Sequence, residues 1–213
     1  MPDTTVRQRA VKAVIPAAGL ATRFLPATKA VPKELLPVVD RPVLQYIVEE
    51  AAAAGITDVL LVTGRGKTSM VDHFDRRPDV EQRLEEKGDT KRLAAVRRTS
   101  ELADIYTVRQ GEPLGLGHAV LVTEASVGNE PFAVVLADDV IDATPPALKQ
   151  MIDVFEHAGG PVLAVERVPM DQVSNYGVIA GEPAPELGKG VYRVKDLVEK
   201  PPRSEAPSDL AII

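Results

Sequence analysis

The sequence contains no cysteine, and histidine is scarce. Its 213 residues include no cysteines and three histidines. The chain therefore forms no disulfide, thiolate metal site or cysteine nucleophile. His73 and His157 are too isolated in the sequence to indicate a metal cluster, and we interpret both as structural or surface residues. The absence of cysteine suits a reducing compartment, and we expect a cytoplasmic location.

Long apolar runs are also absent. No segment approaches the ~20 apolar residues that a bilayer-spanning helix needs. The polar residues 1–8 lack the apolar region of a secretory signal, and we expect residues 1–10 to be a disordered tail. Acidic residues outnumber basic ones by 31 to 25, a net charge of −6. This charge argues against a nucleic-acid or membrane partner, so an anionic substrate would need a local cationic pocket.

Apolar runs of strand length alternate with amphipathic, helix-like segments. We expect strands at 13–17, 58–63, 105–108, 132–137, 162–168, 176–179 and 191–198. We expect helices at 42–54, 68–74, 80–87, 117–126 and 146–157. This alternation predicts an α/β fold with a mostly parallel sheet covered on both faces. In such a sheet, loops at the carboxyl ends of the strands bind ligands. The charge-dense residues 64–91 predict a solvent-facing excursion.

The loop after the first predicted strand is the most informative segment. Residues 15–26 read Ile-Pro-Ala-Ala-Gly-Leu-Ala-Thr-Arg-Phe-Leu-Pro. A strand that breaks into small residues exposes backbone N–H groups to phosphate oxygens or to a base edge. Arg23 and Lys33 add two cations, which together indicate nucleoside triphosphate chemistry; the alternative is a plain turn with solvated cations. Ala21 and Phe24 break the glycine pattern of dinucleotide folds.

Two carboxylates follow the fourth predicted strand. Asp138 and Asp139 come directly after the apolar residues 133–137. A carboxylate at the end of a buried strand is costly unless it is solvated, caps a turn or holds a cation. Magnesium commonly takes one or two carboxylates together with substrate phosphates. Asp138 is our candidate Mg²⁺ ligand, a second and distant ligand is expected, and the alternative is a turn-capping aspartate.

A second polar loop follows the third predicted strand. Gln110 offers both a donor and an acceptor, which can read a base edge such as that of uracil. Gly115 and Gly117 allow close backbone approach at the start of a helix. The alternative is a flexible loop with a surface glutamine. We interpret His118 as a packing residue at the helix start.

Two further segments carry charged candidates. Residues 64–68, Gly-Arg-Gly-Lys-Thr, resemble part of a phosphate-binding loop, but Leu61 stands where that motif requires glycine, and we reject it. Near the end of the chain, Glu199 could accept hydrogen bonds from sugar hydroxyls and Lys200 could contact a phosphate. Such a pair is also typical of an exposed surface.

The assembled pattern resembles the bacterial UTP–glucose-1-phosphate uridylyltransferases, which are sugar nucleotidyltransferases. The resemblance runs from about Lys12 to Ile213 and is most specific at residues 27–42, Ala-Thr-Lys-Ala-Val-Pro-Lys-Glu-Leu-Leu-Pro-Val-Val-Asp-Arg-Pro. It implies a Rossmann-like three-layer fold over residues 11–213, truncated at the C-terminus. The implied ligands are UTP, glucose 1-phosphate, UDP-glucose, pyrophosphate and Mg²⁺.

The resemblance also implies a role for each matching residue. Ala18 and Gly19 would contact the uracil or ribose through the backbone. Gln110 would read the uracil, supported by Gly115 or Gly117. Arg23 and Lys33 would hold the triphosphate, and Asp138 would bind Mg²⁺. Gly177 and Glu199 would hold the glucose, and Lys200 would hold the sugar phosphate.

The sequence departs from the family pattern at two places. Ala21 stands where the broader superfamily often has glycine, so that position must tolerate a Cβ. The chain stops in the apolar run 211–213, where relatives continue with a second metal-binding aspartate and the contacts of a homo-oligomer. A non-catalytic nucleotide-sugar binding module and a glucose-1-phosphate thymidylyltransferase are the alternative functions.

Overall fold

The computed structural model describes residues 9–213, which divide into two compact units. Residues 9–149 form the first unit and residues 150–213 belong to the second. The expected disordered tail lies outside the described residues except for its last two positions. There, Ala10 is buried and Arg9 donates a hydrogen bond to the carbonyl oxygen of Ala54.

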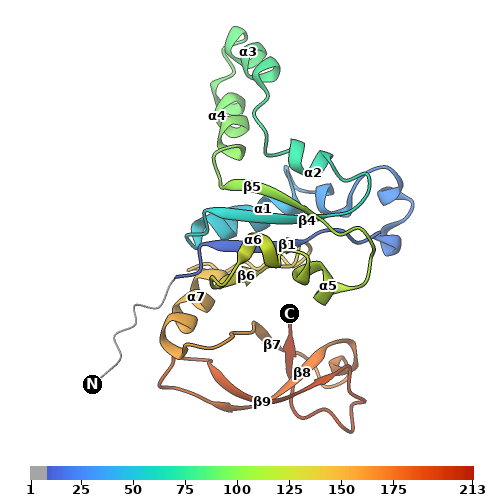
Figure 1. The fold of residues 1–213 in the computed structure, drawn as a ribbon, viewed down its shortest axis with the longest axis vertical. Coiled ribbons are helices and arrows are strands. Elements are labelled where there is room, and N and C mark those ends of the chain that lie inside the picture. The colour runs from blue at the N-terminus through green and yellow to red at the C-terminus, as the bar shows by residue number, and fades with distance from the viewer. Residues whose placement is uncertain (1–8) are drawn as a thin grey trace. The chain divides into compact units, whose positions relative to one another are not determined.

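A parallel sheet is the centre of the first unit (Figure 1). Its four strands lie in the order β5 (Asp104–Arg109), β4 (Asp58–Thr63), β1 (Lys12–Pro16) and β6 (Phe132–Val134). Each neighbouring pair is parallel, so all four strands end at the same edge of the sheet. The predicted parallel sheet is confirmed, and the fourth strand is shorter than predicted.

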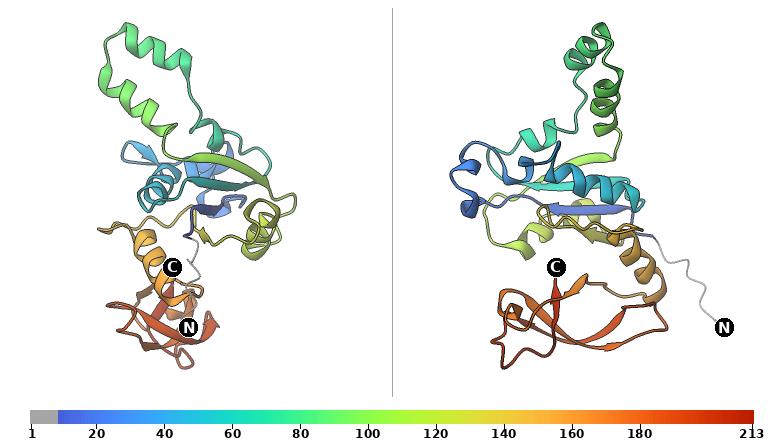
Figure 2. Two further views of the ribbon diagram at one scale, coloured as in Figure 1. Left: turned by 60° about the vertical axis from the view of Figure 1, so that its left-hand side comes forward. Right: turned by 180° about the vertical axis from the view of Figure 1, so that it is seen from behind.

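Helices cover both faces of this sheet. Helix α1 (Val43–Ala53) lies on one face, and α5 (Leu116–Leu121) and α6 (Glu124–Val127) lie on the other (Figures 1 and 2). Successive strand residues point to opposite faces, and in the central strands β1 and β4 both sets are buried, so the middle of each of these strands is apolar. The core on the α5–α6 face consists of Val14, Leu60, Val62, Ala119 and Val127. A single helix was predicted at 117–126; instead, a turn at residues 122–123 separates α5 from α6.

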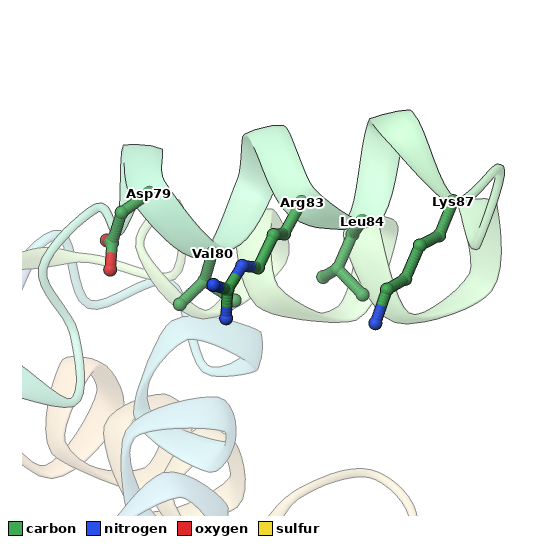
Figure 3. Close-up of a pocket in the computed structure, with 5 residues that line it drawn as sticks. All are labelled: Asp79, Val80, Arg83, Leu84 and Lys87. Carbon is green, nitrogen blue, oxygen red and sulfur yellow. The ribbon is translucent and has the colours of Figure 1, made fainter.

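The connection between β4 and β5 forms the predicted excursion. It contains α2 (Ser69–Asp72), α3 (Pro78–Glu86) and α4 (Thr90–Thr99). Figure 2 shows α3 and α4 as a helical hairpin that projects from the sheet of this unit. A hollow on α3 is lined by Asp79, Val80, Arg83, Leu84 and Lys87 (Figure 3). It lies on the hairpin, away from the edge where the parallel strands end.

Short elements build the segment between β1 and α1. They are three 3₁₀ turns and a small hairpin: η1 (Thr22–Phe24), η2 (Ala27–Lys29), η3 (Lys33–Leu35), β2 (Pro37–Val38) and β3 (Arg41–Pro42). Ala21 precedes the first turn with φ 53° and ψ 39°. An alanine thus occupies the left-handed conformation that glycine adopts more easily.

The second unit is built on an antiparallel sheet that the sequence did not predict. Its strand order is β7 (Val165–Arg167), β10 (Leu210–Ile212), β8 (Gly177–Pro183) and β9 (Tyr192–Glu199). The 3₁₀ turn η4 (Val173–Asn175) precedes β8, and α7 (Ala147–Ala158) leads into this unit from the first. Among the described residues, no helix is long and apolar enough to cross a membrane.

Candidate nucleotide site

The loops that follow β1, β4, β5 and β6 lie together at one edge of the parallel sheet. Ala17 continues the β1–β4 pairing, because its N–H donates to the Val62 carbonyl at 2.9 Å. Gly64, just after β4, approaches the backbone of Ala18 so closely that an added Cβ would lie 2.9 Å from the Ala18 oxygen. The convergence that the strand order predicted is therefore present within this unit.

The first-strand loop leaves its predicted base-contacting groups accessible. Ala18 is half-buried and Gly19 is exposed. Arg23 is exposed on η1, beyond the left-handed Ala21. The Thr28 hydroxyl donates to the Ala21 carbonyl at 3.0 Å and fixes this bend. The result is an accessible small-residue loop followed by an exposed cation, a combination that suits an anionic ligand.

Lys33 and Asp138 meet at the same edge. The Lys33 ammonium lies 2.5 Å from Oδ2 of Asp138, although 105 positions separate the two residues. Their side chains are 19% and 49% exposed, so the carboxylate remains open to solvent. The structure brings the predicted phosphate-binding cation next to the predicted metal ligand.

Gln110 directly follows β5 and is almost completely buried. Its backbone N–H donates to the Thr63 carbonyl at 3.0 Å. The side-chain Nε2 donates to the Gly115 carbonyl at 3.1 Å and lies 3.0 Å from Nδ1 of His118. These contacts commit the amide nitrogen to the protein and leave Oε1 to accept a hydrogen bond. His118 thus orients Gln110. We predicted a packing role for His118 at the start of the helix, and this contact gives it a more specific one.

Two buried charged residues were not among the predicted site residues. The Lys67 ammonium binds both carboxylate oxygens of Glu34, at 2.9 and 3.0 Å, and the Ala17 carbonyl at 2.5 Å. The rejected phosphate-loop motif therefore directs its lysine into the protein. The sequence carries no local signal for these contacts, because Glu34 and Ala17 lie 33 and 50 positions away from Lys67.

The remaining predicted residues lie in the second unit. Gly177 and Glu199 are register partners on β8 and β9. A Cβ on Gly177 would lie 3.1 Å from Oε2 of Glu199, so this glycine leaves room for the carboxylate. Lys200 follows β9 with φ 46° and lies 3.5 Å from Oε1 of Glu199. All three belong to one local cluster, in which Glu199 and Lys200 are exposed.

No ready-made metal cage is present among residues 9–213. They include no cluster of three histidine, aspartate, glutamate or cysteine residues that could hold an ion. Asp138 offers one accessible carboxylate next to the loop of backbone N–H groups. This donor set fits an ion that takes its other ligands from phosphate and water, as Mg²⁺ commonly does.

A parallel sheet with a small-residue loop after β1 is typical of nucleotide-binding α/β proteins. The sequence model of the nucleotidyl transferase family matches residues 12–212. UTP–glucose-1-phosphate uridylyltransferase from Bacillus subtilis is 52% identical over 95% of this chain and 68% of its own length. The chain belongs to this family of sugar nucleotidyltransferases, as the sequence analysis predicted.

Solved structures agree with this assignment. A UDP-glucose pyrophosphorylase in complex with UDP-glucose shares 46% identity and a TM-score of 0.84, over 96% of this chain and 74% of that one. A UTP-bound relative from Acinetobacter baumannii shares 41% identity and a TM-score of 0.89, over 95% and 72%. A glucose-1-phosphate thymidylyltransferase from Bacillus anthracis, described as putative, shares 22% identity and a TM-score of 0.67, over 95% and 69%, and so shows the fold alone.

Proposed function

We propose that the chain transfers a uridylyl group from UTP to glucose 1-phosphate, giving UDP-glucose and pyrophosphate. The observation that supports this proposal is that three groups follow parallel strands that end at one edge of the sheet. They are the Ala18–Gly19 backbone, the oriented amide of Gln110 and the Lys33–Asp138 pair. The family assignment supports UTP over dTTP, because the thymidylyltransferase relative is the more distant one.

The reaction is an in-line displacement at the α-phosphorus of UTP. A phosphate oxygen of glucose 1-phosphate forms a bond to this phosphorus, and the bond from the phosphorus to the leaving pyrophosphate oxygen breaks. The nucleophile is already an anion, so the protein need not remove a proton from it. Alignment and neutralisation of negative charge then supply the catalysis.

The charged side chains of the chain divide this work. Arg23 and Lys33 hold the triphosphate, and Lys200 holds the phosphate of the sugar. Gly177 and Glu199 hold the glucose, and Asp138 holds the divalent ion, which we propose is Mg²⁺. When bound, the ion neutralises charge on the phosphate oxygens. Arg23, Lys33 and Lys200 lower the repulsion between two polyanionic reactants in the same way.

Pyrophosphate release from UTP and glucose 1-phosphate tests the proposal. We expect pyrophosphate to be released when the purified chain is given both substrates and Mg²⁺. This release should stop when the ion is chelated. Lys33→Ala should lower kcat by about 100-fold, equivalent to ~3 kcal/mol of transition-state stabilisation. The free energy of unfolding of this variant should differ from that of the unchanged chain by less than about 1 kcal/mol, because the Lys33–Asp138 pair is partly exposed. Lys29→Ala, at an exposed lysine on the same segment, is the matched control and should retain activity.

The same assay separates the alternatives. UTP binding without pyrophosphate release would support a non-catalytic binding module and contradict the proposed transfer. Equal turnover with UTP and dTTP would contradict the uridylyl assignment. Equal loss of folding and of rate in Lys33→Ala would contradict the role of Lys33.

A further inference from the structure

A buried ion pair, Lys67–Glu34, links the loops of the nucleotide site from inside the protein. Lys67 is 9% exposed and Glu34 is 1% exposed. The ammonium of Lys67 reaches both oxygens of Glu34 and the carbonyl of Ala17 at 2.5–3.0 Å. One side chain therefore joins three segments that are far apart in the sequence.

Two of these three segments carry a residue of the proposed site. Ala17 immediately precedes Ala18 and Gly19, which present the backbone to the base. Glu34 immediately follows Lys33 in the turn η3. Consecutive residues in a 3₁₀ turn point about 120° apart. Fixing the Glu34 side chain inside the protein therefore directs Lys33 toward Asp138, which its ammonium reaches at 2.5 Å.

Stability alone gives no reason for charges at this position. Removing two charges from water costs several kcal/mol per ion, and well-packed apolar residues commonly replace a buried pair with no loss of stability. Apolar side chains would not bind the Ala17 carbonyl or fix the direction of η3. The pair supplies geometry that an apolar cluster of the same volume would not.

We propose that Lys67 is a positioning residue for the transfer reaction. It holds the Ala17–Gly19 backbone and the Lys33 turn in one fixed arrangement, and it does so without touching the substrates. This inference rests on the proposed function. The conformational order of the loop at residues 17–24 can be measured whether or not the chain catalyses the transfer.

Three variants test the inference. Lys67→Met leaves the Glu34 carboxylate buried without its cation, so this variant should lose both stability and activity. The double variant Lys67→Met/Glu34→Met removes both charges and should recover most of the thermal stability. Its kcat/KM should nevertheless stay 10- to 100-fold below that of the unchanged chain, because small misplacements of reacting groups cost rates of this size. Arg77→Met/Asp79→Met removes an exposed pair on the helical hairpin and should leave kcat/KM unchanged.

Hydrogen exchange gives a readout that does not depend on turnover. Within residues 17–24, the amides of Ala17 and Phe24 donate to the carbonyl oxygens of Val62 and Ala21. These two amides should exchange at least tenfold faster in the double variant than in the unchanged chain, and at the unchanged rate in the hairpin control. A double variant that regains full kcat/KM together with its stability would overturn the inference. Unchanged exchange at residues 17–24 would overturn it as well. A chain that shows no turnover but faster loop exchange in the double variant contradicts the proposed function, and it then supports only the part of the inference that Lys67 orders the loop.

Discussion

The side-chain amide of Gln110 illustrates how single contacts set the choice of base. Its nitrogen is committed to Gly115 and His118, so its oxygen is the group left for a ligand. The N3–H of uracil can donate a hydrogen bond to this oxygen, whereas N3 of cytosine carries no hydrogen. If Gln110 reads the base as proposed, this orientation of its amide should favour UTP over CTP.

Loss of His118 should weaken that choice. In His118→Ala the amide of Gln110 keeps only the Gly115 carbonyl as its partner, so it can turn more easily and offer its nitrogen to the base. We expect the ratio of kcat/KM for UTP to that for CTP to fall about tenfold, the value of one hydrogen bond. Parallel turnover assays with both nucleotides measure this ratio. An unchanged ratio would mean that Gln110 is oriented without His118.

Gly177 gives a second prediction at this scale. An added methyl group would lie 3.1 Å from Oε2 of Glu199, and that flexible side chain would have to move. We expect Gly177→Ala to raise the KM for glucose 1-phosphate several-fold while the Kd for UTP stays the same. Gly181→Ala on the same strand meets no atom closer than 3.4 Å and is the matched control. A change in UTP affinity alone would contradict the assignment of Gly177 to the sugar.

Local sequence predicted the residues whose type and spacing carry a signal. The small-residue loop, Lys33, Gln110 and Asp138 all follow strands that end at one edge, and parallel topology brings them together. The Lys67–Glu34 pair and the His118 contact could not be predicted, because each depends on a tertiary partner that spacing does not reveal. Their residues carry no local signature of burial.

At the scale of elements, the α3–α4 hairpin depends on ion pairs. Glu81 is 4% exposed and receives hydrogen bonds from Arg76 on one side and Arg97 of α4 on the other. Hydrogen bonds from these two guanidinium groups lower the pKa of Glu81 from its ordinary 4.5 to about 2. Only the ionised carboxylate gains from them. Its contribution to stability is therefore complete above pH 4.5 and is lost as the pH falls toward 2.

This linkage predicts a pH-dependent effect of one substitution. Glu81→Gln should lower the thermal unfolding midpoint by a constant amount above about pH 5. The difference from the unchanged chain should shrink as the pH falls below 4.5. Glu86→Gln on the same helix, where the carboxylate accepts from Gln82, should show a much smaller effect. A difference that stays constant from pH 6 to pH 3 would show that the guanidinium groups do not hold Glu81 ionised.

The sequence predicted most accurately the helices and strands that have a clear apolar periodicity. The buried strands β1 and β4 and helix α1 lie within a residue or two of their predicted bounds. Helix α4 was not predicted, because its segment is dominated by charge and its partners come from α3. Strand β10 was read only as an apolar run, since its pairing with β7 and β8 joins residues more than 30 positions apart.

At the scale of the molecule, the proposed roles divide between the two units. The residues assigned to UTP and to the metal all lie in residues 9–149, and those assigned to the sugar and its phosphate lie in residues 150–213. The alternating α/β pattern predicted the first unit well, because its central strands β1 and β4 are buried, mostly apolar runs. In the antiparallel second unit, β10 lies between β7 and β8 and pairs with residues more than 30 positions away in the sequence, and no short-range pattern specifies that order.

The most direct test of the account is a crystal structure of the chain with UTP and Mg²⁺. We expect the uracil to lie within hydrogen-bond distance of the Gln110 side chain and the Ala18–Gly19 backbone. The phosphates should lie against Arg23 and Lys33, with Asp138 on the ion. A nucleotide bound elsewhere, or an Asp138 that contacts no ion, would contradict the account.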